Sequence, residues 1–198
     1  MGIALFKEED EYSEYIQGKI CEPLMKDKKY CLRILINSNS YSKYIVNHLA
    51  SYFSYAPILI DNQNEGSFSP QVVFTYFPTE SKEFVTLCNY FTANGGERSI
   101  TIGRFTKKEN LSVMERDKFP MSQFSLERSA YYLIDKLELF EILDTLDCQC
   151  KIDIRKIELI QNTPDTARLN ILTNLNNLKQ GKSVVLRNVN FDFNSLSF

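Results

Sequence analysis

Short apolar runs alternate along the chain with longer stretches in which apolar residues recur near the helical period. The runs of strand length are 32–37 (LRILIN), 56–61 (APILID), 71–77 (QVVFTYF) and 98–105 (RSITIGRF). The stretches that predict amphipathic helices are about 9–28, 41–53 and 81–93. Apolar strands separated by helices are typical of parallel βαβ units. The pattern therefore predicts an α/β fold with a doubly wound, open parallel sheet in three flavodoxin-like α/β/α layers.

The chain of 198 residues suits one domain with an extension. We expect the α/β domain to span residues 1–150. Residues 151–198 carry more Lys and Arg than Asp and Glu, and their pattern predicts strand, helix and strand. This C-terminal extension either forms part of the same domain or packs against it.

Composition narrows the class of protein. Hydrophobic residues make up 43% of the chain and charged residues 24%, as in globular domains, and the formal net charge is -2. A general nucleic-acid binder needs clustered Lys and Arg, which this balance does not provide. The first residues become acidic too early for a signal peptide, and no apolar run reaches the length of a membrane span. We therefore expect a cytoplasmic protein that does not contact membranes.

The five cysteines are an odd number without a C-x-x-C pair, and the chain has one histidine. Together with the expected compartment, this predicts reduced thiols. Cys148-x-Cys150 could instead bind a soft metal or form a redox pair, although no other ligand lies nearby in the sequence. The prediction is that the protein uses no metal and no organic cofactor.

Two polar loops follow predicted strands and lead into predicted helices. The carboxyl ends of parallel strands meet at one edge of a sheet, and the N-terminus of a helix favours an anion. The hydroxyls of these loops would add donors for a phosphate group. The residues predicted to bind ligand are Asn39, Ser40, Ser42, Thr79, Glu80 and Ser81. The alternative is that the same residues only cap helices.

Three stretches in order resemble one family. The segment QVVFTYFPTESKEFVTLCNYFTANGGERSITIGRF resembles the centre of the sugar isomerase (SIS) domain, which binds phosphosugars, and Glu80-Ser81 matches the Glu-Thr pair of its Ser-x-Ser-Gly-Glu-Thr loop. LRILINSNSYSKYIVNHLASYF resembles its first strand, loop and helix. FSLERSAYYLIDKLELFEIL is similar to the closing helix in transcriptional regulators of the RpiR/MurR type. The resemblance covers roughly residues 10 to 147.

This resemblance implies a regulatory module that binds a sugar phosphate or a similar anionic metabolite. It also implies a homodimer, which would contact DNA only through a domain absent from this chain. One alternative is a dimerisation or interaction scaffold with a vestigial site. Another is an aldose-ketose isomerase, which would need a general base such as Glu80 and help from His48. Both residues have simpler roles in a helix, so we expect a protein that is not an enzyme.

Overall fold

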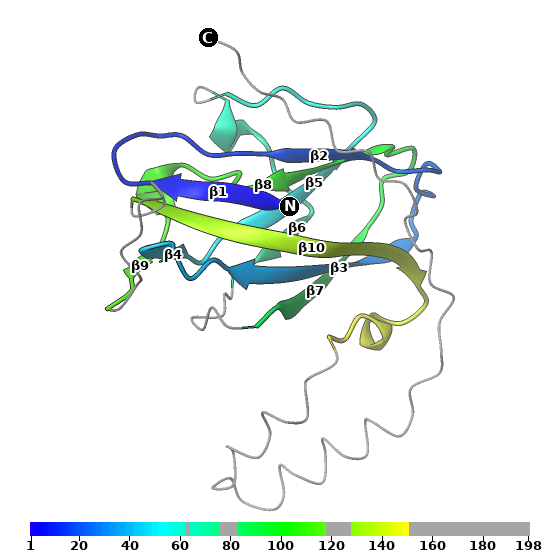
Figure 1. Ribbon diagram of the computed structural model, residues 1–198. Helices are drawn as coiled ribbons and strands as arrows, with labels where there is room; N and C mark the ends of the chain where they lie inside the picture. The colour runs from blue at the N-terminus through cyan, green and yellow to red at the C-terminus, as the bar shows by residue number, and fades with distance from the viewer. Residues whose placement is uncertain (62–63, 76–82, 118–127, 151–198) are drawn as a thin grey trace, which may run out of the picture.

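The protein is built almost entirely of antiparallel strands. The structure, a computed structural model, describes residues 1–61, 64–75, 83–117 and 128–150 (Figure 1). One four-stranded sheet, here the first sheet, has the order β1 (Gly2–Lys7), β10 (Ser129–Ile142), β3 (Lys29–Ser38) and β7 (Val85–Thr92). The second sheet has the order β2 (Ile16–Lys19), β8 (Ser99–Gly103), β5 (Leu49–Ser54) and β6 (Val72–Phe74).

Short elements complete the described chain. The strands β4 (Tyr44–Val46) and β9 (Val113–Glu115) form a separate two-stranded sheet. In the ranges that the structure describes, the helices are three 3-10 turns, which are η1 (Glu65–Ser67), η2 (Lys108–Asn110) and η3 (Thr145–Asp147). No described helix is long and apolar enough to cross a membrane.

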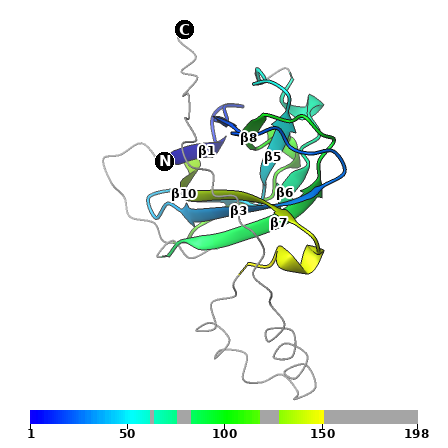
Figure 2. The same ribbon diagram turned by 90° about the vertical axis from the view of Figure 1, so that its right-hand side faces the viewer.

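The two larger sheets pack face to face, as Figures 1 and 2 show. The chain crosses repeatedly between them, so strands that follow each other in sequence usually lie in different sheets. Two facing four-stranded antiparallel sheets with such crossings form a double-sheet jelly roll. Side chains that alternate inward from both sheets form one hydrophobic core, with its centre at residues such as Leu32, Ile34, Phe53, Ile100 and Ile102.

The predicted α/β fold with a parallel sheet is therefore wrong. Some strands were placed correctly, since 32–37 lies within β3 and 98–105 contains β8. The predicted strand 71–77 contains β6, which pairs antiparallel with β5. The predicted strand 56–61 has no regular structure, and none of the predicted helices is present in the described residues. The resemblance to the SIS domain consequently has no support from the fold.

The stretch 124–143 shows why a strand was mistaken for a helix. Its described part forms β10, in which Tyr132, Ile134, Leu137 and Leu139 face the core. A bulge between Ile134 and Leu137 adds a residue to the alternation, which changes one spacing from two to three. Apolar residues separated by three and two positions resemble one face of a helix.

The other predicted helices have a different explanation. Leu87 and Phe91 of β7 face the main core, whereas Cys88 points to the opposite face and is covered there by other residues. When both faces of a strand are covered, the apolar positions no longer follow period two. In the stretch 41–53, the chain forms β4 and β5 with a turn between them, so that it presents two short strands to the core.

Asn94-Gly95-Gly96, which follows the predicted helix 81–93, connects β7 to β8 in the other sheet. Both glycines have a φ of 93°, a backbone conformation that other residues rarely adopt. The buried carboxylate of Glu97 accepts hydrogen bonds from the backbone N–H groups of Asn94 at 2.8 Å and Gly95 at 2.9 Å. This turn is therefore fixed by its own sequence.

Candidate functional site

The first predicted ligand loop lies at the end of β3, where its side chains bind the protein itself. The Ser42 hydroxyl accepts a hydrogen bond from the Tyr131 N–H at 2.8 Å and lies 3.4 Å from the Tyr131 carbonyl oxygen. Ser42 is fully buried. The Asn39 side chain accepts from the Tyr41 N–H at 3.0 Å, and Ser40 is partly buried. The structure thus brings Asn39, Ser40 and Ser42 together, but in the connection from β3 to β4, which is hydrogen-bonded to β10.

The carbonyl groups of this loop face the guanidinium of Arg116. Arg116 donates hydrogen bonds to the carbonyl oxygens of Asn39 at 2.6 Å and Ser42 at 2.8 Å, and to the Ser38 hydroxyl at 2.7 Å. Burial lowers the pKa of Arg116, because the charged form loses hydration there. The loop is therefore held by a cation of the same chain.

The second predicted loop, with Thr79, Glu80 and Ser81, lies outside the described residues. The C-terminal extension 151–198 lies outside them as well. His48 is placed between β4 and β5 and not within a helix. Its pKa is lowered, first by burial and then by the positive charge of Arg104. His48 Nε2 is buried and makes no hydrogen bond with the described part of the chain.

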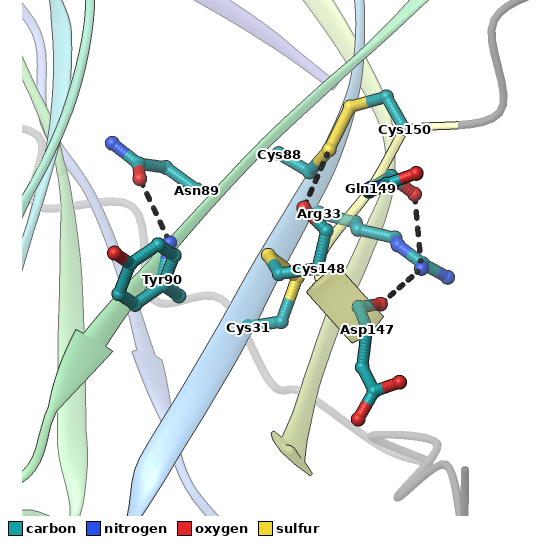
Figure 3. Close-up of a disulfide and its surroundings, with 9 residues drawn as sticks. All are labelled: Cys31, Arg33, Cys88, Asn89, Tyr90, Asp147, Cys148, Gln149 and Cys150. Atoms are coloured by element: carbon teal, nitrogen blue, oxygen red, sulfur yellow. Dashed lines mark hydrogen bonds between the residues drawn. A yellow bond between two sulfur atoms is a disulfide. The ribbon is translucent and has the colours of Figure 1, made fainter. Parts of the chain in front are cut away.

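The cysteines correct another prediction, because four of the five form disulfides. Cys31 of β3 is bonded to Cys148, and Cys88 of β7 is bonded to Cys150 (Figure 3). Cys21 is exposed and forms no disulfide. The prediction of reduced thiols is therefore wrong for both disulfide pairs. The two half-cystines of the C-x-C sequence join neighbouring strands of the first sheet to the segment that follows β10.

That segment, residues 143–150, is here called the strap. It begins with η3, where the Asp144 side chain accepts from the Leu146 N–H at 3.0 Å and the Asp147 side chain accepts from the Asp144 N–H at 3.2 Å. This reciprocal capping turns the chain back after β10. The strap then reaches the outer face of the first sheet, the face directed away from the main core.

Alternation along β3 explains what the strap covers. Tyr30 and Leu32 belong to the main core, so Cys31 and Arg33 point to the outer face. There Cys31 packs with two residues of β10, Phe140 and Ile142, in a small second cluster that also includes Cys88 and Cys148. Because the strap covers the outer face, β3 is covered on both of its faces here.

Arg33 connects the strap to this face by polar contacts. Its guanidinium donates hydrogen bonds to the carbonyl oxygens of Asp147 at 3.4 Å and Gln149 at 3.2 Å (Figure 3). It also lies 4.6 Å from the centre of the Phe140 ring, within the range of a cation–π contact. The C-x-C spacing was a usable signal in the sequence, but its partners could be identified only once β3 and β7 were known to be neighbours.

A second candidate surface lies at the end of the sandwich near the start of β3. Here three connections are joined by backbone hydrogen bonds, and we call this surface the Tyr55 end. Gly96 N–H donates to the Leu24 carbonyl at 2.7 Å, and Leu24 N–H donates to the Glu97 carbonyl at 3.0 Å. Arg98 N–H donates to the Ser54 carbonyl at 2.9 Å. The connections after β2, β5 and β7 therefore form one rigid base.

Tyr55 projects from this base, with 69% of its surface exposed. Its ring contacts Gly96 so closely that a Cβ atom at that position would lie 2.7 Å from Tyr55 Cε1. Met25, 52% exposed, belongs to the connection after β2 that forms the same base. The Tyr55 end thus combines a large exposed ring with a backbone held by hydrogen bonds. Sequence analysis did not identify this surface, because it placed residue 55 directly before a predicted strand, 56–61, that the structure does not contain.

The described residues contain no group of three or more His, Cys, Asp or Glu side chains that could hold a metal ion. No known protein family, curated protein or solved structure matches this chain.

Proposed function

We propose that the protein is a recognition module that binds carbohydrate at the Tyr55 end. The observation that carries the proposal is the exposed ring of Tyr55, which is supported by Gly96 on a base of three hydrogen-bonded connections. A ring held in this way loses little conformational freedom when a ligand covers it, which favours binding. Jelly rolls include lectins, but since a fold does not determine function, the proposal depends on this surface.

A sugar ring suits the chemistry of this surface. Tyrosine has an apolar ring face and a polar hydroxyl, and a pyranose has a face of C–H groups surrounded by hydroxyls. The ring of Tyr55 would cover the C–H face. Exposed polar groups of the same base, such as Lys26, which lies against Gly95, would bind the hydroxyls. A protein partner would need a larger apolar surface, since stable protein interfaces bury about 800 Å² on each side.

The two disulfides support a proposal about the compartment. Disulfides persist in oxidising environments and are rare in the reducing cytosol. We therefore propose that the module works in an oxidising compartment, in place of the cytoplasm that the sequence suggested. Mass spectrometry of the protein isolated from its native source would test this. We expect that four cysteines cannot be alkylated until the disulfides are reduced. Full alkylation without reduction would contradict it.

The effector-binding function inferred from the sequence stays a prediction, as do the homodimer and the absence of enzymatic activity. Its physical argument required two loops at the N-termini of helices. In the described residues, one of these loops is a turn between strands, held by Arg116. The Tyr55 end favours a sugar ligand for a different reason, which is stacking of the tyrosine ring on the sugar and not binding of a phosphate.

The test is binding of the full chain to an array of neutral and anionic glycans, followed by calorimetry on the best ligand. Removal of the ring in Tyr55→Ala should weaken binding at least tenfold, which corresponds to about 1.4 kcal/mol. Tyr55→Phe should retain most of the affinity, because the ring is preserved.

Tyr41→Ala is the matched control. Tyr41 is 45% exposed and follows the other end of β3, so its loss should leave glycan binding unchanged. Equal losses in Tyr55→Ala and Tyr41→Ala, or no binding to any glycan on the array, would contradict the proposed function.

A further inference from the structure

The two disulfides differ in burial. In Cys31–Cys148, Cys31 is completely buried, at 0% exposure, and Cys148 is partly exposed, whereas in Cys88–Cys150 both cysteines are partly exposed. A thiolate that attacks a disulfide must reach one of its sulfur atoms, so access determines which bond exchanges first. We propose that Cys88–Cys150 is a site of thiol–disulfide exchange that reacts with small dithiols and dithiol oxidoreductases, while Cys31–Cys148 is structural.

Arg33 provides the second argument. In the antiparallel pair of β3 and β7, Arg33 lies directly opposite Cys88. Side chains at such positions share one face, with Cβ atoms about 5 Å apart. The Arg33 Nε–H group is buried and has no hydrogen-bond partner in the described part of the chain. A cation with an unused donor therefore stands beside the sulfur of Cys88.

The other charged side chain on this row of residues is already paired. Glu138 of β10 lies opposite Arg33 on its far side, and its carboxylate is 2.7 Å from the ammonium of Lys136. From the strap, the Cys148 carbonyl oxygen lies 3.8 Å from Cys88 Sγ (Figure 3). The partial negative charge of this carbonyl opposes a thiolate, but the full charge of Arg33 outweighs it.

The exchange step follows from this geometry. A thiolate of the dithiol attacks Sγ of Cys150, the Cys88–Cys150 bond breaks, and its electron pair leaves on Cys88 Sγ as a thiolate beside Arg33. The second thiol of the reagent then attacks the mixed disulfide, loses its proton to solvent and releases Cys150, which takes up a proton. The reagent becomes a disulfide, and its two electrons reduce the protein disulfide.

The consequence is a partial release of the strap. Cys148 stays bonded to Cys31 of β3, so the strap remains attached to the first sheet. Residue 150, which leads into the C-terminal extension, loses its covalent link to β7. This exchange does not depend on glycan binding, because the disulfide lies on the outer face of the first sheet and reacts with a dithiol.

The experiment titrates the oxidised full chain with redox buffers of graded potential. Free thiols are trapped with one alkylating reagent, remaining disulfides are reduced and trapped with another, and peptides are quantified by mass spectrometry. Cys88 and Cys150 should be labelled together at a less reducing potential than Cys31 and Cys148. Reduction of all four at one potential, or of Cys31–Cys148 first, would overturn the proposal.

Arg33 is a positioning residue in this proposal, and a pH profile tests its role. In Cys150→Ser, the rate of Cys88 alkylation against pH should give a thiol pKa below the ordinary value of about 8.5. Arg33→Gln in the same background should raise that pKa, and Arg33→Lys should restore part of the decrease. If the pKa of the Cys88 thiol were ordinary and the same in both Arg33 variants, Arg33 would have no role in the mechanism, even if the order of reduction held.

Discussion

Arg116 Nη2 lies 2.7 Å from the hydroxyl oxygen of Ser38, so a side chain just after β9 is bonded to the end of β3. The same guanidinium donates to the carbonyl oxygens of Asn39 and Ser42. Two neighbouring strands of the first sheet, β3 and β10, are therefore linked through one cation to β9 of the two-stranded sheet, since Ser42 is in turn bonded to Tyr131 of β10. The loop that resembled a ligand site in the sequence is a junction of the fold.

Replacement of this cation should destabilise the protein. Arg116→Gln removes donors from three buried or partly buried carbonyl and hydroxyl groups, and each hydrogen bond to a charged group contributes about 1.5–3 kcal/mol. Because neighbouring bonds are not additive, we expect a loss of about 3 kcal/mol in the free energy of unfolding, measured by urea denaturation. Arg128→Gln is the control.

Arg128 also pairs with an acidic residue, Glu9, but both side chains are about two-thirds exposed. Exposed ion pairs contribute about 0–1 kcal/mol, so the control should lose little. If both arginine variants had the same stability, Arg116 would not be the residue that holds the loop.

A buried hydroxyl supports the neighbouring strand β4. Tyr132 is fully buried, accepts a hydrogen bond from the Val46 N–H at 2.9 Å and donates to the Val46 carbonyl at 3.0 Å. Burial raises its pKa far above the ordinary value, so the hydroxyl stays protonated. Tyr132→Phe should cost about 1–3 kcal/mol, because both backbone groups of Val46 lose their partner.

The measurement is thermal and urea unfolding of Tyr132→Phe beside Tyr90→Phe. Tyr90 lies on the exposed side of β7, with 44% of its surface accessible. A phenylalanine there should leave the free energy of unfolding unchanged within about 0.5 kcal/mol. If Tyr132→Phe left the free energy of unfolding unchanged, water would be the partner of the Val46 backbone groups in the variant.

Sequence reasoning found buried segments better than it found their structure. It correctly placed strands at 32–37 and 98–105, because these continuous apolar runs are buried in a sheet of either kind. It failed at β10, where a bulge shifts the apolar positions, and at β7, where the strap partly covers Cys88 on the outer face. Local periodicity cannot reveal cover that comes from residues 60 positions away in the chain.

The site was less predictable than the fold. The candidate residues Asn39 and Ser42 were chosen because hydroxyl and amide groups near a helix start suit an anion. Without the helix, the same groups satisfy backbone partners in a turn. The C-x-C spacing of Cys148 and Cys150 is visible in the sequence, but the pairing with Cys31 and Cys88 depends on the order of strands in the first sheet.

The turn between β7 and β8 should not accept a side chain at Gly95. Its φ of 93° is strained for alanine, and a Cβ atom would lie 2.9 Å from the backbone of Lys26, which cannot move freely. Strained backbone of this kind costs about 1–3 kcal/mol. Gly95→Ala should therefore lower the free energy of unfolding by at least this amount, as measured by urea denaturation.

Gly66→Ala is the matched control for this prediction. The atom nearest to a Cβ at Gly66 is Lys107 Cγ at 3.6 Å, an ordinary contact on an exposed side chain. This variant should keep the stability of the parent protein. A tolerated Gly95→Ala would mean that the turn can change its conformation, and the rigid base proposed for Tyr55 would lose support.

Stability should also depend on the protonation of His48. Burial and the charge of Arg104 lower its pKa in the folded state, relative to about 6.5 in the unfolded chain. The unfolded chain therefore binds the proton more readily, and stability rises with pH in the range where the two states differ. The contribution of His48 is complete above pH 6.5 and is lost as the pH falls from that value through the lower pKa of the folded state.

Urea unfolding at pH 7.5 and pH 5.5 measures this effect, with His48→Gln as the comparison. The parent protein should lose more stability than the variant between the two values, since other titrating groups contribute equally to both. The chain has one histidine, so the difference can be assigned to His48. If the parent and the variant lost the same amount on acidification, the charge of Arg104 and the burial of the imidazole would have no effect on its protonation.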